Sequence, residues 1–288
     1  MNAPGSPPGW PPDSPSGEDG WAGGAFGERA RCVLAANPNP MTLDGTNTWV
    51  LREPGSARSV VIDPGPELPE HLDAVASYAG DVAVVLLTHG HLDHSEAART
   101  FAERVGCGVR SLDPRHRLGG EGLGDGDVVE VDGLEIRVVA TPGHTSDSLS
   151  FVLPAERAVL TGDTVLGRGT TVVAHPDGRL GAYLDSLHRL HALAEAQELT
   201  SVWPGHGPVL EDALGVLDRY LVHRRQRLEQ VRAALASLEQ PVKDGPEHPS
   251  EKDALPRRIV ELVYADVDPV LWGAAELSVR AQLAYLRG

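Results

Sequence analysis

One run of the sequence, Val82 to His94, constrains the fold of this chain more than any other. Val82 to Leu87 is wholly apolar, which is typical of a strand buried on both faces of a sheet in an α/β fold. His89 and His91 follow two residues apart, so in an extended segment both side chains point to the same side. The sequence therefore predicts a buried strand that ends in a chelating pair.

A second pair of metal-capable side chains, Asp93 and His94, comes directly after the first. Gly90 lets the backbone bend closely around an ion held by the first pair. Asp93 and His94 stand where the chain turns towards a helix expected over Ser95 to Val105, with Ser95 as its cap. They therefore point to a neighbouring position, which predicts a second metal ion beside the first.

The rest of the chain to about residue 210 contains two sets of strands, each followed by a helix. The expected strands are Cys32 to Ala36, Thr48 to Leu51, Ser59 to Ile62 and Val82 to Leu87, then Val128 to Val131, Leu134 to Ala140, Leu149 to Leu153, Ala158 to Leu160 and Ser201 to Trp203. Glu67 to Tyr78 and Leu180 to Ala194 have the apolar spacing of helices. This order predicts an α/β fold of four layers, with two sheets face to face and helices outside.

Three further metal-capable residues occupy the same position relative to their strands as His89. His144, Asp163 and His206 each follow the carboxyl end of an expected strand, and each has a glycine beside it. Ligands bind at this edge of α/β sheets, because the rigid sheet aims the loop side chains. We therefore expect these three residues to complete the metal site.

The resulting set holds five histidines and two aspartates, enough for two ions with an open position for water. Two such cations lower the pKa of water and stabilise negative charge that develops on a substrate. The set predicts a hydrolase with two divalent ions. Imidazole and carboxylate without thiolate suit zinc best, while manganese and iron also accept these ligands.

The overall composition narrows the function classes. The net charge of −16 argues against a protein that coats nucleic acid or an anionic membrane. Only two cysteines are present, so a disulfide framework is not expected. No apolar run is long enough to span a bilayer, and the N-terminus lacks a signal peptide pattern. These features predict a cytoplasmic protein.

The chain is expected to have three parts. Residues 1–27 are dominated by Pro, Gly and Ser and are predicted to be a disordered tail. Residues 28–210 form the α/β domain, and residues 211–288 form a helical domain with helices over Leu210 to Leu238, Ala254 to Tyr264 and Val270 to Leu286. Arg224, Arg225 and Arg227 in the first of these helices are interpreted as a solvated face.

The metal motifs resemble those of a known family. Thr88 to His94, Thr141 to His144, Thr161 to Asp163 and Pro204 to Gly207 are similar to the motifs of the metallo-β-lactamase superfamily. The resemblance implies an αββα sandwich, with one metal on His89, His91 and His144 and the other on Asp93, His94 and His206. It also implies that Asp163 bridges the two metals and that Asp93 orients the nucleophilic water.

Within that superfamily, Gly45 to Thr48, Leu166 to Thr171 and the C-terminal extension most resemble the β-lactamase-like protein 2 group. This resemblance favours a phosphodiesterase for single-stranded RNA. A thioesterase, as in related polyketide proteins, or a glyoxalase II type acyl hydrolase is the alternative, and a non-catalytic metal-containing binding protein is the alternative of another class. The substrate is thus a small ester or thioester or single-stranded RNA, and the oligomeric state is left open.

The same resemblance implies that the C-terminal helices are winged-helix-like. Arg280, Gln282 and Arg287 are then expected on the outer face of the last helix.

Overall fold

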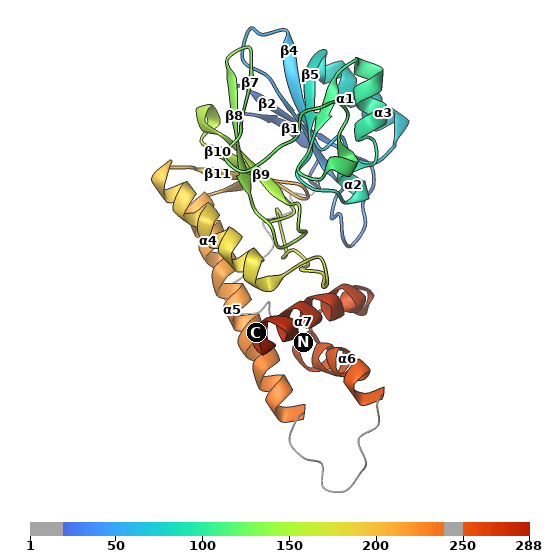
Figure 1. The fold of residues 1–288 in the computed structure, drawn as a ribbon, viewed down its shortest axis with the longest axis vertical. Coiled ribbons are helices and arrows are strands. Elements are labelled where there is room, and N and C mark those ends of the chain that lie inside the picture. The colour runs from blue at the N-terminus through green and yellow to red at the C-terminus, as the bar shows by residue number, and fades with distance from the viewer. Residues whose placement is uncertain (1–19, 239–249) are drawn as a thin grey trace, which may run out of the picture.

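Two six-stranded sheets pack face to face, with helices on the outer side of each (Figure 1). The computed structural model describes residues 20–238 and 250–288. The four-layered α/β arrangement that the sequence predicts is confirmed. Within the described residues, no helix is both long enough and apolar enough to cross a membrane.

The first sheet has the order β1-β2-β3-β4-β5-β6. Its strands are β1 Gly23–Phe26, β2 Ala30–Leu34, β3 Asn47–Leu51, β4 Arg58–Ile62, β5 Asp81–Leu86 and β6 Gly108–Arg110. The first four strands form an antiparallel meander, whereas β4, β5 and β6 are parallel. A short 3-10 helix, Pro114–His116, follows β6. Because β4 and β5 run parallel, their carboxyl ends meet at one edge of the sheet.

The second sheet has the order β12-β11-β10-β9-β8-β7. Its strands are β7 Val128–Val131, β8 Leu134–Ala140, β9 Leu149–Leu153, β10 Ala158–Gly162, β11 Ser201–Pro204 and β12 Leu210–Glu211. A 3-10 turn, Pro154–Glu156, links β9 to β10. The pair β10 and β11 is parallel, and the other pairs are antiparallel. Because β10 and β11 are parallel, the loops that follow them lie at the same edge of the second sheet.

Helices cover the outer faces of both sheets. Against the first sheet lie α1 Pro69–Ala79 and α3 Ala98–Val105, preceded by the short α2 Leu92–Ser95. Against the second sheet lie α4 Leu180–Ala196 and the first part of α5 Ala213–Leu238. Each layer buries its own apolar cluster, since Phe101 packs with α1 and the first sheet and Tyr183 packs with the second.

The space between the sheets is a large apolar core. The rings of Trp49 and Trp203, one from each sheet, stack with centroids 5.0 Å apart. Leu51 and Phe151 are fully buried in the same cluster. At the edge beyond these residues the backbones of the two sheets also meet, because the amide of Asn47 donates to the carbonyl of Gly205 at 2.8 Å. This hydrogen bond joins the two sheets at the edge where β10 and β11 end.

The predicted tail of residues 1–27 is wrong at its C-terminal end. Gly23–Phe26 form β1, and the side chains of Trp21 and Phe26 pack against the core between the sheets. Trp21 Nε1 also donates to Asn47 Oδ1 at 2.8 Å. Pairing with β2 satisfies the backbone of this glycine-rich stretch, a contact between strands that composition does not reveal. Residues 1–19 lie outside the described part of the chain.

The helix predicted over Ser95 to Val105 is divided in two. Leu92–Ser95 form the short α2, and α3 begins only at Ala98. Ser95 is not the cap of a long helix, because its hydroxyl donates to the carbonyl of Gly90 at 3.1 Å. This hydrogen bond closes the turn that contains His89 and His91, the two predicted metal ligands before α2.

Three helices complete the chain. After α5 come α6 Ser250–Val263, the 3-10 turn Pro269–Leu271 and α7 Trp272–Arg287. The start of α5 is later than predicted, because Leu210–Glu211 pair with β11 instead. The first part of α5 packs on α4, and its last turns pack on α6 and α7 around Val231 and Ile259. The long helix α5 thus joins the α/β layers to the C-terminal helices (Figure 1).

Two predictions about the C-terminal surface are wrong. Gln282 does not lie on an outer face, since it is buried and its Nε2 donates to Tyr264 Oη at 3.0 Å. Arg224 does not lie on a solvated face, since α5 carries it against the loop after β10. In both cases the helix packs on a partner that is distant in sequence, so its own spacing of polar residues does not show which face is buried.

Candidate metal centre

Seven predicted metal ligands come together at the shared edge of the two sheets. His89 and His91 follow β5, and Asp93 and His94 lie in α2, the short helix after this loop. The other three, His144, Asp163 and His206, follow β8, β10 and β11. They form two groups, one of His89, His91, His144 and Asp163 and one of Asp93, His94 and His206. Within each group all ligand atoms lie within 4.8 Å of one another.

In the first group, three imidazole nitrogens point to one place. His91 Nδ1 lies 3.0 Å from His89 Nε2 and 3.1 Å from His144 Nε2. Nitrogens around one tetrahedral zinc ion lie about 3.3 Å apart. When two imidazole nitrogens face each other at this distance without a cation, one of them must carry a proton and donate it to the other. A metal ion between them would let both nitrogens act as ligands. The spacing and the donor type both fit a metal ion.

The second group has the same compact geometry. His206 Nε2 lies 3.2 Å from His94 Nε2 and 3.1 Å from Asp93 Oδ2. Asp163 stands between the groups, with Oδ1 3.3 Å from His94 Nε2 and Oδ2 3.6 Å from His144 Nε2. The buried Oδ1 atom of Asp163 has no hydrogen-bond partner in the described chain. A carboxylate oxygen left in this state fits a ligand shared between two cations.

Four of the five histidines are oriented by a hydrogen bond at the ring nitrogen that faces away from the group. For His94 the acceptor is Asp63 Oδ2 at 2.9 Å, and for His144 it is the carbonyl of Val172 at 2.7 Å. His206 and His89 use the carbonyl of Gly45 and the hydroxyl of Thr88 in the same way, both at 3.0 Å. Such contacts fix the tautomer that leaves Nε2 free for a metal.

Asp63 is a site residue that the sequence reasoning missed. It follows β4 just as His89 follows β5, and it is 2% exposed. Besides His94, its carboxylate accepts from the amide of Thr88 at 2.8 Å and from the hydroxyl at 2.6 Å. Its place after a strand at the same sheet edge was the available signal.

Burial and charge divide the histidines into two kinds. Burial, aided by repulsion from His94, holds the pKa of His89 well below its usual value, and burial also lowers the pKa of His144. Burial acts in the same direction on His206, but Asp163 outweighs it and raises the pKa of His206 to about 9. The pKa of Asp163 stays well below its usual range, because His206 and His94 outweigh the effect of burial. In the second group, His206 therefore holds a proton in the absence of metal, and a bound metal cation would replace that proton.

A glycine is required at the centre of the site. A Cβ atom on Gly205 would lie 2.6 Å from Asp163 Oδ1 and 2.7 Å from His94 Cε1. No side chain fits there without displacing both ligands. This close approach explains why Gly205 separates β11 from His206.

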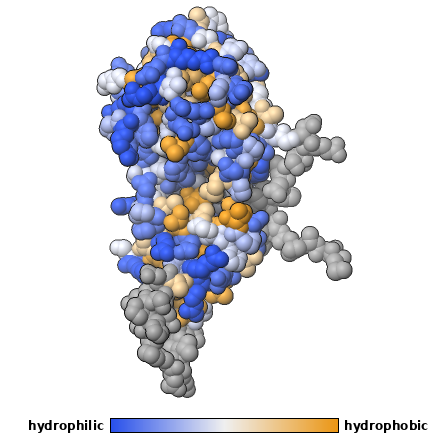
Figure 2. Space-filling model, turned by 90° about the vertical axis from the view of Figure 1, so that its right-hand side faces the viewer, coloured by the Kyte–Doolittle hydropathy of each residue, from blue (hydrophilic) through white to orange (hydrophobic). Residues whose placement is uncertain are grey.

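A cavity of about 300 Å³ opens from the metal centre towards the C-terminal helices. His144 and Asp163 line its inner end. Its other walls come from the loops around Leu43 and Thr171 and from α5, α7 and the segment before α7. The wall is mostly apolar and includes Met41, Leu43, Leu166, Val172, Val267, Leu271, Ala274 and Ala275. On the face seen in Figure 2, apolar surface also gathers in the lower half.

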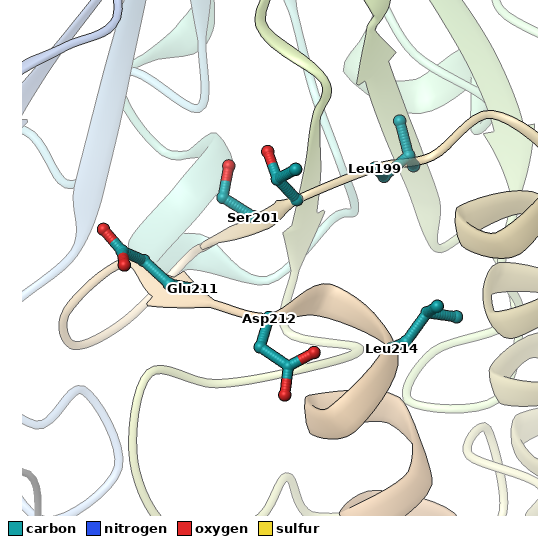
Figure 3. A pocket seen from close by; sticks show the side chains of 6 residues that line it. Leu199, Ser201, Glu211, Asp212 and Leu214 are labelled. Atoms are coloured by element: carbon teal, nitrogen blue, oxygen red, sulfur yellow. The ribbon is translucent and has the colours of Figure 1, made fainter.

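A second hollow, lined by residues from Leu199 to Leu214, lies at the opposite end of β11. Ser201 starts that strand, whereas His206 follows its end. The whole length of β11, at about 3.3 Å per residue, therefore lies between this hollow and the metal centre. Its carboxylates, Glu211 and Asp212, point in different directions (Figure 3). Asp212 accepts from the amide of Gly215 at 3.1 Å, in the first turn of α5. Asp212 thus has a structural role at the start of α5.

Known proteins resemble this chain in sequence. A model of the metallo-β-lactamase superfamily matches residues 41–206. A protein of Caenorhabditis elegans named β-lactamase-like protein 2 homolog is 33% identical over 226 residues, which cover 72% of this chain and 71% of that protein. An atrochrysone carboxyl ACP thioesterase of Aspergillus fumigatus is 35% identical over 218 residues, 72% of this chain and 65% of the fungal protein.

Solved structures share the fold. A β-lactamase domain protein from Burkholderia ambifaria aligns with a TM-score of 0.72 at 23% identity and covers 96% of this chain and 93% of its own. At this level of identity the similarity establishes the fold, including the presence of C-terminal elements beyond the two sheets.

Proposed function

Because this chain belongs to the metallo-β-lactamase superfamily, we propose that it hydrolyses an acyl thioester with the help of two divalent metal ions. The observation that carries the proposal is that two of the seven donors, His144 and Asp163, line a mostly apolar pocket beside the candidate metal centre. The donor groups supply the chemistry, and the pocket limits the substrate to a small acyl group.

The seven donors divide between the ions as the two groups suggest. His89, His91 and His144 would hold one ion, Asp93, His94 and His206 would hold the other, and Asp163 would be shared between them. Zinc is the proposed metal, because tetrahedral nitrogen and oxygen sites without thiolate suit it, while manganese or iron is accepted by the same donors. When bound, the ions lower the pKa of water and stabilise negative charge on the substrate oxygen.

Asp93 is the proposed catalytic residue. Its side chain is 29% exposed, against 11% for Asp163, so it is the carboxylate of the site that water reaches more easily. The neighbouring histidines hold the pKa of Asp93 below its usual value, against the effect of burial. In hydrolysis, the water oxygen bonds to the carbonyl carbon, the carbon–sulfur bond breaks, and the thiol receives a proton. Asp93 is placed to orient the water and accept its proton.

Hydrolysis of single-stranded RNA is the second candidate. Exposed arginines on α5, Arg225 and Arg232, favour it, because they could contact phosphates outside the pocket. Two observations favour hydrolysis of a thioester over hydrolysis of RNA. The chain carries a net charge of −16, and Arg224, an arginine that lines the pocket, is buried in its wall. A cytoplasmic location remains a prediction.

The proposal is tested with one preparation of the protein purified without chelator. We expect two metal ions per chain by elemental analysis, hydrolysis of short acyl-CoA thioesters, and no cleavage of single-stranded RNA. His91→Ala should abolish the hydrolysis, and Arg99→Ala, at an exposed site on α3, should not. Cleavage of RNA alone would overturn the thioester assignment. Fewer than two ions with no hydrolysis after reconstitution would favour the non-catalytic binding protein.

A further inference from the structure

Arg224 is a buried cation in the wall of the pocket. It lies on α5 and is 7% exposed. Its Nη2 donates to the carbonyl of Thr171 at 2.5 Å, and its guanidinium carbon lies 4.8 Å from the centre of the Tyr183 ring. Its Nε atom is buried and has no hydrogen-bond partner among the residues that the structure describes. Arg224 therefore keeps an unused donor inside the protein.

The charge of Arg224 is also uncompensated, unlike that of the other pocket arginines. Arg168 forms an ion pair with Asp44, and Arg227 lies 3.8 Å from Asp266. Within residues 20–238 and 250–288, Arg224 forms no ion pair with a carboxylate. A buried cation without a counter-ion costs free energy, which an anionic ligand would recover.

Thr171 places Arg224 close to the metal centre. The carbonyl of Thr171 accepts from Arg224, and its hydroxyl lies 3.2 Å from His144 Nδ1. Thr171 therefore contacts both Arg224 and the side of the His144 ring that faces away from the donor group. Arg224 and His144 both line the pocket, and Leu271 and Ala274 belong to its apolar wall.

No other group in the pocket takes up the charge of Arg224. His223, its neighbour on α5, lines the same cavity. Burial lowers the pKa of His223 to about 4, and the charge of Arg224 contributes to this effect, so the ring is neutral near pH 7. The Asp163 carboxylate belongs to the metal site. The charge thus remains available to a ligand.

We propose that Arg224 binds a carboxylate at the far end of the acyl group, so that the pocket is built for thioesters of short dicarboxylic acids. The reacting carbonyl lies at the metal centre, the methylene carbons contact Leu271 and Ala274, and the terminal carboxylate pairs with the guanidinium. A carboxylate is the anion that an acyl group carries at its end. The catalytic part of this inference rests on the proposed thioester hydrolysis, whereas the binding part does not.

A purely structural role of Arg224 predicts a different result. If Arg224 only ties α5 to the loop at Thr171, its loss lowers the binding of every pocket ligand to the same extent. If it binds a carboxylate, its loss weakens only ligands with a terminal anion. The test therefore compares two ligands that differ at this end alone.

Calorimetric titration of the metal-loaded protein with glutarate and with pentanoate makes this comparison. Both acids have five carbons and one carboxylate for the metal centre, but glutarate has a second carboxylate. We expect glutarate to bind at least about tenfold more tightly. Arg224→Gln should remove this preference, and Arg225→Gln, an exposed neighbour on the same helix, should retain it. Equal affinity of the wild-type protein for both acids would overturn the inference, whether or not Arg224→Gln folds.

The kinetic comparison uses glutaryl and pentanoyl thioesters of the same thiol. We expect a higher kcat/KM for the glutaryl ester, and Arg224→Gln should lower kcat/KM for this ester alone. Equal loss for both esters would indicate the structural role and overturn the inference. If neither ester is hydrolysed but glutarate still binds more tightly than pentanoate, the thioester function fails while the carboxylate site stands.

Discussion

The metal centre and the pocket beside it are built in different ways. All seven donors of the centre come from loops after strands and from the short helix α2, and each loop is set by the strand before it. The outer wall of the pocket comes mainly from α5, α7 and the turn before α7, which reach the site through helix packing. In this molecule the seven candidate donors are therefore fixed by the sheets and α2, whereas part of the pocket wall depends on how the C-terminal helices dock.

Among substitutions that should affect one region and not the other, the largest effect is expected for Asp63→Asn, which should weaken metal binding and leave the pocket unchanged. The substitution keeps the shape of the side chain and tolerates the positive φ of 50° at this position. It removes the charge that orients His94, so the affinity of the second donor group for metal should fall by about 10- to 100-fold. Competition with a chromophoric chelator measures this loss.

The control for this variant is Asp81→Asn, at the exposed start of β5. It should bind metal as the wild type does. In Asp63→Asn, activity should fall at limiting metal and recover in excess metal, while the affinity for glutarate in excess metal stays unchanged. A loss of glutarate affinity under those conditions would show that the two regions are not independent.

The difference between the two regions also explains how much could be predicted from the sequence. The strands and the seven donors are encoded locally, by apolar runs that end in glycine and a metal-capable residue. The structure brings all seven together as expected. Their assignment as ligands of two ions remains a prediction. Asp63 follows the same rule and could have been found from its place after β4.

Arg224 and Gln282 could not have been placed from the sequence. Arg224 donates to Thr171, which lies 53 residues earlier, and Gln282 donates to Tyr264, just past the end of α6. The polar residues on these helices are compatible with either a solvated or a buried face, and only the docking of the helices decides between them. The same reason applies to β1, whose pairing with β2 depends on contacts that a Pro- and Gly-rich composition hides.

A smaller effect is expected for Ala274→Leu, which changes the pocket alone. Ala274 lies on α7 and lines the cavity without contributing to the metal centre. Leucine would occupy part of the space for the acyl chain, so kcat/KM for a six-carbon acyl thioester should fall by about tenfold. The rate for an acetyl thioester and the metal content should stay unchanged. Ala284→Leu, at an exposed position of α7, is the matched control. An equal loss for both esters would mean that α7 also positions the metal centre.

The smallest effect is expected for Tyr220→Phe, which removes a hydroxyl that hydrogen-bonds α5 to the loop after β10. The Tyr220 hydroxyl on α5 accepts from the amide of Leu166 at 2.8 Å, in the loop between the metal centre and the pocket wall.

Without the hydroxyl, the buried amide of Leu166 loses that acceptor, so we expect a loss of about 1 kcal/mol in the free energy of unfolding. For a chain of this size, such a loss lowers Tm by about 2–4 °C. Thermal unfolding followed by circular dichroism measures the shift. Tyr285→Phe, whose ring is 46% exposed on α7, should leave Tm unchanged. If Tyr220→Phe lowers Tm as expected but leaves metal affinity intact, the loop is held by α5 for the pocket rather than for the metal. A fall in metal affinity would instead show that helix docking supports the donors as well, and the division between the two regions would not hold.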